Sequence, residues 1–132
     1  MDTDRLAAVL EHNFSGIVPP GIPVEARNGI LHYSTDPAGQ FGAATGTAGT
    51  LVRDNFGILG QGDEENIVNI SVQALDELQD FVSEVTTDPW PGTTRQPQPH
   101  GQVRDSVLFL WYGDPGDPDL ACAPIRLTDL AG

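Results

Sequence analysis

Apolar residues recur at helical spacing along the stretch from about Asp63 to about Thr87. The stripe they form consists of Ile67, Ile70, Ala74, Leu75, Leu78, Phe81, Val82 and Val85. Gly62-Asp63 is a start signal, and the acidic residues that follow suit the positive N-terminal end of a helix dipole. Asp88-Pro89 ends the pattern, because the residue before a proline is pushed out of the helical region. The pattern therefore predicts one long amphipathic helix.

A shorter helix is predicted near the N-terminus, from about Thr3 to Phe14. Its apolar positions follow helical spacing and are Leu6, Val9, Leu10 and Phe14. Ser15-Gly16 stops it. The segment from Ile17 to Pro23 carries three prolines, so we expect an extended stretch there.

Two alternating runs, Val24–Arg27 and Ile30–Tyr33, flank Asn28-Gly29. Asn-Gly tolerates the positive φ angles of a type I′ turn and predicts a two-residue hairpin. The register then pairs Arg27 with Ile30, Ala26 with Leu31, Glu25 with His32, and Val24 with Tyr33. Val24, Ala26, Leu31 and Tyr33 should share the core face, with Glu25 and His32 opposite each other on the other face.

The same turn chemistry recurs at Arg53-Asp54-Asn55 and at Arg104-Asp105-Ser106. One interpretation is that three hairpin turns use the same residues for the same local reason. The other is an old duplication, because the order helix, then hairpin, occurs twice along the chain.

Near the C-terminus, Val107–Tyr112 and Leu120–Leu127 predict two strands. The first is apolar nearly throughout, which favours a central strand covered on both faces, or covered by the core on one face and by another chain on the other. Residues 38–50 and 91–101 are expected to be flexible loops, the second polyproline-like. Residues 1–132 are therefore expected to form a single α+β domain, with antiparallel hairpins packed against one long helix and a shorter N-terminal helix.

The charge balance is strongly acidic, with 19 Asp and Glu against six basic residues and a net charge of −13. Such a field repels phosphate backbones and anionic lipid, so nucleic acid and membrane surfaces are poor partners. The acidic N-terminal residues and the lack of a long apolar stretch favour a cytoplasmic protein. A single cysteine, Cys122, agrees with a reducing compartment.

The motifs of several enzyme classes are missing from the sequence. There is no lysine for a phosphate-binding loop and no Gly-x-Ser-x-Gly, His-Glu-x-x-His or Cys-x-x-Cys pattern. The histidines, His12, His32 and His100, are scattered over different predicted elements. Cys122 is expected to be a small buried residue rather than a nucleophile. The sequence predicts no cofactor and favours a protein that is not an enzyme.

Carboxylates of the long helix stack one turn apart, at Asp76, Glu77, Asp80 and Glu84. They form either a solvated face or a docking face for a basic partner, whose approach would relieve the repulsion between like charges.

A second group of carboxylates, Asp114, Asp117 and Asp119, lies in the loop between the two C-terminal strands. They are candidate calcium ligands, although Asp, Gly and Pro are also turn formers. Trp90 and Trp111 are candidate contact anchors, and Trp90 is expected mainly to close the core.

Asp88-Pro89-Trp90-Pro91-Gly92, Leu110-Trp111-Tyr112-Gly113-Asp114 and Ala123-Pro124-Ile125 resemble the C-terminal half of small acidic uncharacterised proteins from GC-rich actinobacteria. The resemblance covers roughly residues 60–127 and implies a bacterial, cytosolic origin without a catalytic activity. The order of elements is also similar to that of secretion-chaperone α+β folds, which implies dimerisation through sheet and helices.

The sequence thus favours a non-enzymatic acidic protein-binding module, namely an adaptor, a chaperone or an immunity-like protein. A homodimer that binds a protein with a basic surface is the expected assembly. The alternative is a small-molecule or metal-assisted enzyme with a site near Glu25, His32 and the Asp114–Asp119 loop.

Overall fold

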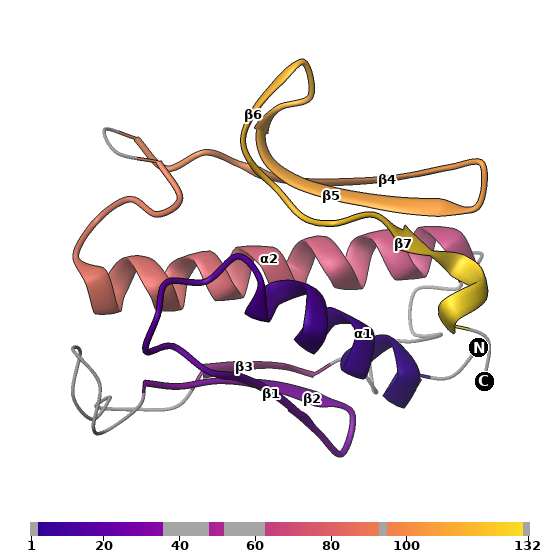
Figure 1. Ribbon diagram of the computed structural model, residues 1–132, viewed down its shortest axis with the longest axis horizontal. Helices are drawn as coiled ribbons and strands as arrows, with labels where there is room; N and C mark the ends of the chain where they lie inside the picture. Colours follow the sequence, from indigo (N-terminus) through magenta and orange to yellow (C-terminus); the bar gives the residue numbers. More distant parts are fainter. Residues whose placement is uncertain (1–2, 36–47, 52–62, 93–94, 131–132) are drawn as a thin grey trace.

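The computed structural model describes residues 3–35, 48–51, 63–92 and 95–130. These residues form an α+β fold in which α1 (Thr3–Ser15) and α2 (Asp63–Thr86) lie between two antiparallel sheets (Figure 1). The N-terminal sheet has the order β1 (Val24–Arg27), β2 (Ile30–Tyr33), β3 (Ala48–Leu51). The C-terminal sheet has the order β4 (Pro99–Arg104), β5 (Val107–Asp114), β6 (Asp117–Ala121), and β7 (Ile125–Arg126) also pairs with β5. A short 3-10 helix, η2 (Leu127–Leu130), follows.

Both predicted helices are confirmed, with ends within one residue of those expected. The apolar stripe of α2 is buried, apart from Val85, which is half-buried. α2 packs against β2 and β3 on one side and against β4 and β5 on the other. α1 packs against β1 and β2 through Leu6, Ala7, Leu10 and Phe14. The core therefore consists of two layers, one on each side of α2.

The first hairpin has the register that its turn predicts. Val24 pairs with Tyr33 and Arg27 with Ile30. Asn28 and Gly29 have φ angles of 55° and 74°, as a type I′ turn requires. Of the four expected core positions, Val24, Leu31 and Tyr33 are buried and Ala26 is half-buried.

The second hairpin turns at Asp105 and Ser106, again as predicted, with φ angles of 53° and 62°. Along β5 the side chains alternate: Leu108, Leu110 and Tyr112 are buried, whereas Val107, Phe109 and Trp111 are half-exposed. The strand therefore has one core face and one outer face. The expected central position is confirmed, because β5 pairs with β4 on one edge and with β6 and β7 on the other. The alternative in which both faces are covered does not fit, because Val107, Phe109 and Trp111 are only half-buried, whereas Tyr112 on the other face bonds the Leu75 carbonyl of α2.

Three predicted boundaries are wrong. Residues 48–50 of the first expected loop belong to β3, which pairs with β2, and residues 36–47 and the third turn at 53–55 lie outside the described residues. The expected polyproline linker ends early because β4 begins at Pro99, and proline is tolerated as the first residue of an edge strand. The expected strand Leu120–Leu127 is divided into β6, β7 and part of η2, because Pro124 has no N–H for a ladder bond.

Each sheet follows a helix along the chain, with three strands after α1 and four after α2 in the described residues. This repeat extends the helix–hairpin pattern that suggested a duplication. Within the described ranges, no helix combines the length and the apolar character needed to span a bilayer.

Candidate functional site

The acidic ridge, defined as Asp76, Glu77, Asp80 and Glu84, lies on the solvent side of α2. Three of its residues are exposed and Glu77 is half-buried. The Glu77 carboxylate accepts a hydrogen bond of 3.2 Å from the Gln73 amide one turn earlier. The ridge faces outward because the sheets on both sides of α2 already cover its apolar positions.

The ionised form of Asp76 is disfavoured by its surroundings. Partial burial raises the pKa of its carboxyl group above the usual 3.8, and the neighbouring charges of Asp80 and Glu77 raise it further. Both effects disfavour the ionised form. A nearby positive charge would favour the ionised form again.

The ridge runs beside the start of β4. One turn before Asp76, the Val72 side chain lies against Gly101 of β4, where an added Cβ would come within 2.9 Å of Val72 Cγ2. About one turn after Asp76, the Gln79 amide donates a hydrogen bond of 2.5 Å to the Pro97 carbonyl. Asp76 therefore borders the outer edge of the C-terminal sheet.

Trp90 closes the core at the end of α2, as the sequence mainly predicted. Its ring meets Tyr112 edge-on, with 5.5 Å between ring centroids and an angle of 70°. The Trp90 carbonyl accepts a hydrogen bond from the Ser83 hydroxyl. Trp90 is half-buried and packs against the core, so these contacts favour its structural role over that of a contact anchor.

Trp111 lies on the outer face of the C-terminal sheet, away from the core. Its ring stacks on His100, its cross-strand partner, with 5.7 Å between centroids and an angle of 29°. Its Nε1–H donates a hydrogen bond of 3.1 Å to the Gly113 carbonyl. Trp111 is therefore a half-exposed aromatic group that is held in one orientation.

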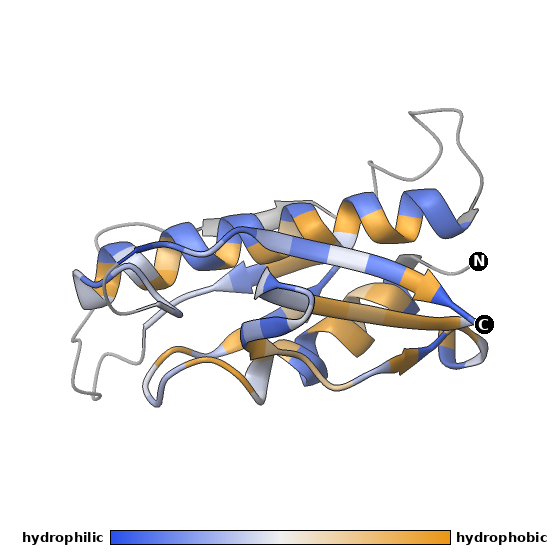
Figure 2. Ribbon diagram, turned by 90° about the horizontal axis from the view of Figure 1, so that it is seen from above, coloured by the Kyte–Doolittle hydropathy of each residue, from blue (hydrophilic) through white to orange (hydrophobic). Residues whose placement is uncertain are grey.

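Phe109 lies two residues before Trp111 on the same face of β5. The Arg104 guanidinium carbon is 4.8 Å from the centre of the Phe109 ring, a cation–π contact. Together, the side chains of this outer surface form what we call the aromatic face: His100, Gln102, Arg104, Val107, Phe109 and Trp111. Figure 2 shows the apolar β5 beside the more polar β4, with α2 along the β4 edge. The aromatic face and the acidic ridge are thus neighbours.

Charges of opposite sign mark the two ends of the aromatic face. Arg104 and Arg126 both lie opposite Val107, on either side of β5, and form the basic end, where the two arginines outnumber the exposed Asp105 of the turn. The hairpin between β5 and β6 carries Asp114, Asp117 and Asp119, all exposed, and forms the acidic end. Sequence reasoning did not single out Phe109, Arg104 or Arg126. The Asp105-Ser106 turn could have identified the first two, because its register places Arg104 and Phe109 on one face.

A small recess of about 260 Å³ opens on the aromatic face next to Trp111. Its lining includes Pro115 and Pro118 of the β5–β6 hairpin together with Phe109 and Arg104. The hairpin bends out of the plane of the sheet (Figure 1). This bend begins at the register shift between Tyr112 and Gly113, where Gly113 has a φ of 97°.

The Asp114–Asp119 hairpin does not gather its carboxylates into a calcium site. Within the described part of the chain, no three His, Cys, Asp or Glu side chains lie together in a way that could hold a metal ion. Asp114 and Asp117 are instead the last ladder pair before the tight turn. The interpretation of these residues as turn formers fits this arrangement better.

The alternative enzyme site is only partly assembled. Glu25 and His32 are cross-strand neighbours, as predicted. Glu25 also lies 3.6 Å from the Arg27 guanidinium, in an exposed ion pair. The β5–β6 hairpin lies on the opposite side of the helices from β1 and β2 (Figure 1). The fold therefore does not bring the Asp114–Asp119 loop to Glu25 and His32.

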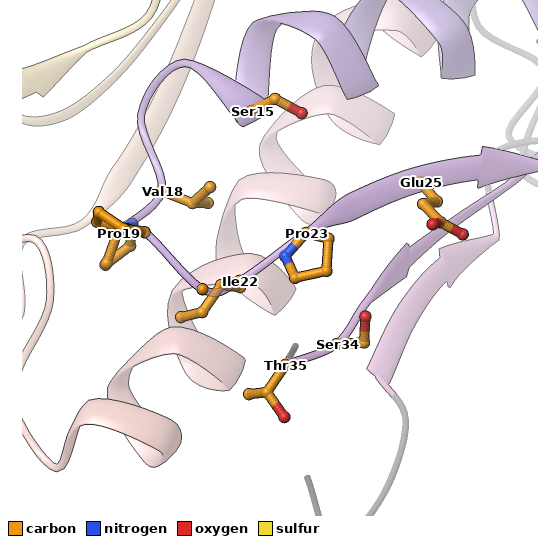
Figure 3. A pocket seen from close by; sticks show the side chains of 10 residues that line it. Ser15, Val18, Pro19, Ile22, Pro23, Glu25, Ser34 and Thr35 are labelled. Atoms are coloured by element: carbon orange, nitrogen blue, oxygen red, sulfur yellow. The ribbon is translucent and has the colours of Figure 1, made fainter. Parts of the chain in front are cut away.

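A shallow pocket of about 700 Å³ lies between the end of α1 and the first hairpin (Figure 3). Val18, Pro19 and Ile22 line one side, and Glu25 and Ser34 line the other. Glu25 is the one ionisable side chain among its described lining residues. The other polar side chains of the lining are the hydroxyls of Ser15, Ser34 and Thr35. Among the residues that the structure describes, none of these hydroxyls bonds to Glu25.

Cys122 is buried at the end of β6, as expected. Burial raises the pKa of its thiol to about 12, so it is protonated at neutral pH. Burial also raises the pKa of the Tyr112 hydroxyl. That hydroxyl donates to the Leu75 carbonyl at 2.7 Å, which is a structural role. Neither group has the depressed pKa of an activated nucleophile.

Comparison of the chain with protein-family models, with curated proteins and with solved structures finds no match to any of them.

Proposed function

We propose that this chain is a non-enzymatic protein-binding module, an acidic adaptor, chaperone or immunity-like protein. The observation that carries the proposal is the half-exposed pair Phe109 and Trp111 on the outer face of the C-terminal sheet. Aromatic residues and arginine are enriched at protein interfaces, and Trp, Tyr and Arg dominate their binding energy. The aromatic face combines these residue types in one place.

The Trp111 side chain is also held in one orientation in the free chain. Its stack on His100 and its hydrogen bond to the Gly113 carbonyl already fix the ring. A side chain that is ordered in the free protein loses little conformational entropy in a complex. The open surface around it, which mixes aromatic and polar side chains, suits a protein partner better than a small molecule, which needs an enclosing pocket.

The acidic ridge supports a basic protein as one partner. No described residue forms an ion pair with Asp76, Asp80 or Glu84, and the whole chain carries a net charge of −13. A field of this sign raises the association rate of a positively charged protein. The single cysteine supports a cytoplasmic location as part of the same proposal.

A displayed peptide library, selected on the immobilised chain, tests the basic partner. We expect peptides rich in Arg and Lys, whose affinity falls about tenfold or more in Asp76→Asn/Asp80→Asn/Glu84→Gln. The matched control, Glu25→Gln/Asp88→Asn/Asp129→Asn, removes three exposed charges elsewhere and should bind nearly as well as the unaltered chain.

Trp111→Ala tests the aromatic face in the same way. Loss of a central aromatic residue typically weakens an interface by about 2 kcal/mol or more, so protein association through this face should weaken at least about tenfold. If the ridge variant and its control lower the affinity for the peptides equally, the role of the ridge is contradicted. Protein association that survives Trp111→Ala unchanged would contradict the role of the aromatic face.

A further inference from the structure

We propose that the protein seated on the aromatic face is a second copy of this chain, in a two-fold symmetric dimer. The inference rests on the proposed function, since it names the occupant of one proposed binding surface. It is carried by the arrangement of charge on that face. Arg104 and Arg126 lie at one end, the Asp114–Asp119 hairpin at the other, and Phe109 and Trp111 between them.

A surface with opposite charges at its two ends is complementary to itself. In a two-fold dimer the same patch of each copy faces the other, with the directions reversed. An axis that passes between Phe109 and Trp111 places the basic end of one copy opposite the acidic end of its partner. Val107 lies three residues before Leu110, the residue between the two aromatic side chains, and Asp114 lies four residues after it, beyond the bend at Gly113.

The apolar centre of the face fits the same arrangement. With the axis between Phe109 and Trp111, each Phe109 faces the Trp111 of the other copy. The β5–β6 hairpin rises from the plane of its sheet (Figure 1), so it would reach over the edge of the second copy. The recess between this hairpin and Trp111 is open toward that copy and can receive one of its side chains.

A basic protein fits this face less well than a second copy does. Arg104 and Arg126 would oppose it at one end. The acidic ridge lies outside the aromatic face, along the β4 edge, and remains available in the dimer. Two copies repel each other through their net charge of −13, but this repulsion is screened over about 8 Å at physiological salt. The opposite charges at the two ends of the face attract each other across the interface, at distances shorter than this screening length.

The area of the face sets the expected strength of the dimer. Three strands spaced about 4.8 Å apart, with about eight residues along the longest, give a small sheet face. Such a face measures roughly 14 Å by 27 Å, or about 400 Å² per copy, which is smaller than most specific interfaces, so we expect a weak dimer with a dissociation constant in the high micromolar range. Sedimentation velocity in about 0.15 M salt, over a range of protein concentrations, should show a monomer–dimer equilibrium.

An exchange of charges tests the two-fold arrangement directly. In Arg104→Glu/Arg126→Glu both ends of the face are acidic, and in Asp114→Arg/Asp117→Arg both are basic. Each variant alone should be monomeric at concentrations where the unaltered chain dimerises. An equimolar mixture of the two should form a heterodimer, because opposite ends meet again.

The control variant Glu25→Arg/Arg27→Glu exchanges an exposed charge pair on β1 and should dimerise like the unaltered chain. Unchanged thermal unfolding of each variant shows that it is folded. If a charge variant does not fold, Phe109→Ser provides the second test, since it should abolish the dimer without altering any charge.

Three outcomes would overturn the inference: an unaltered chain that is monomeric at all concentrations, a mixture that forms no heterodimer, or charge variants that dimerise alone. The dimer and the binding of a basic partner can be contradicted independently of each other. A monomeric chain that still binds basic peptides through the ridge contradicts the dimer alone. A dimer that follows the charge exchange, with peptide binding that the ridge variant does not affect, contradicts the basic partner alone.

Discussion

Tyr33 and Tyr112 donate hydrogen bonds to consecutive carbonyl groups in the middle of α2. The Tyr33 hydroxyl reaches the Ala74 carbonyl at 3.3 Å and the Tyr112 hydroxyl reaches the Leu75 carbonyl at 2.7 Å. Tyr33 comes from the N-terminal sheet and Tyr112 from the C-terminal sheet. Both rings are fully buried, so each hydroxyl needs a partner inside the protein. The two sheets are thus joined to the same turn of one helix.

Replacement of either tyrosine with phenylalanine removes one of these bonds without removing the ring. We expect each change to lower the free energy of unfolding by about 1 kcal/mol. The loss should be larger for Tyr112→Phe, whose bond is shorter. Urea denaturation measures both. A loss that is larger for Tyr33→Phe would contradict this assignment.

Gly101 allows β4 to lie close to α2, which Gly101→Ala tests. A Cβ at this position would come within 2.9 Å of Val72 Cγ2 and 3.0 Å of Leu110 Cδ2. Overpacking of this kind costs about 1–3 kcal/mol. Gly116→Ala is the matched control, because nothing lies within 4 Å of a Cβ there. Equal unfolding midpoints for the two variants would show that Val72 and Leu110 move aside without a loss of stability.

Ser106 adopts a left-handed conformation that glycine tolerates better. Its φ is 62°, at the second position of the β4–β5 turn. A non-glycine residue in this region is strained by about 1 kcal/mol. We therefore expect Ser106→Gly to raise the free energy of unfolding by about 0.5–1 kcal/mol. Ser106→Ala keeps the strain and should give no gain, so equal gains for both variants would refute the explanation.

Asp76→Asn should stabilise the protein at neutral pH. The pKa of Asp76 is raised in the folded protein, so the folded state binds more protons than the unfolded state above about pH 3.8. Stability contributed by this group is therefore highest below that pH and falls as the carboxyl group ionises. Removing the charge should give about 0.2–0.5 kcal/mol, the cost of a like-charged pair one turn apart.

The gain from Asp76→Asn should be present at pH 7 and absent near pH 2.5, where the carboxyl group is protonated in both states. Thermal unfolding at the two pH values measures the difference. A gain of the same size at both would mean that the asparagine stabilises α2 for a reason other than charge.

Local chemistry explains why much of the fold could be predicted from the sequence. The Asn28-Gly29 turn permits one hairpin register, and the alternation beside it decides which face is buried. The apolar stripe of α2 is long enough to distinguish the spacing of a helix from that of a strand. Asp105 and Ser106 form a similar turn although neither is glycine.

The wrong boundaries arise where tertiary packing overrides local signals. Pro99 appeared to belong to a linker, but as the first residue of an edge strand it needs no ladder donor. Leu120–Leu127 is apolar enough for one strand, yet after Ala121 the ladder is interrupted. One further bond, from the Cys122 N–H to the Leu110 carbonyl at 2.9 Å, follows the last ladder pair. Two residues later Pro124 has no N–H to donate.

The aromatic face was only partly predictable for a related reason. Every residue from Val107 to Tyr112 is apolar, so alternation cannot tell which side faces the core. Trp111 was identified as a candidate because it is a tryptophan. Arg126 could not be placed beside Val107, because that pairing depends on the short strand β7, which no local pattern marks.

The position of α2 between the two sheets has a consequence for how the chain can fold. The C-terminal sheet buries Leu108, Leu110 and Tyr112 against α2, and the N-terminal sheet, with α1, uses the opposite side of the same helix. Neither half of the chain encloses its own hydrophobic residues without this helix. The two sheets therefore depend on the same helix, and the chain should unfold in a single cooperative transition.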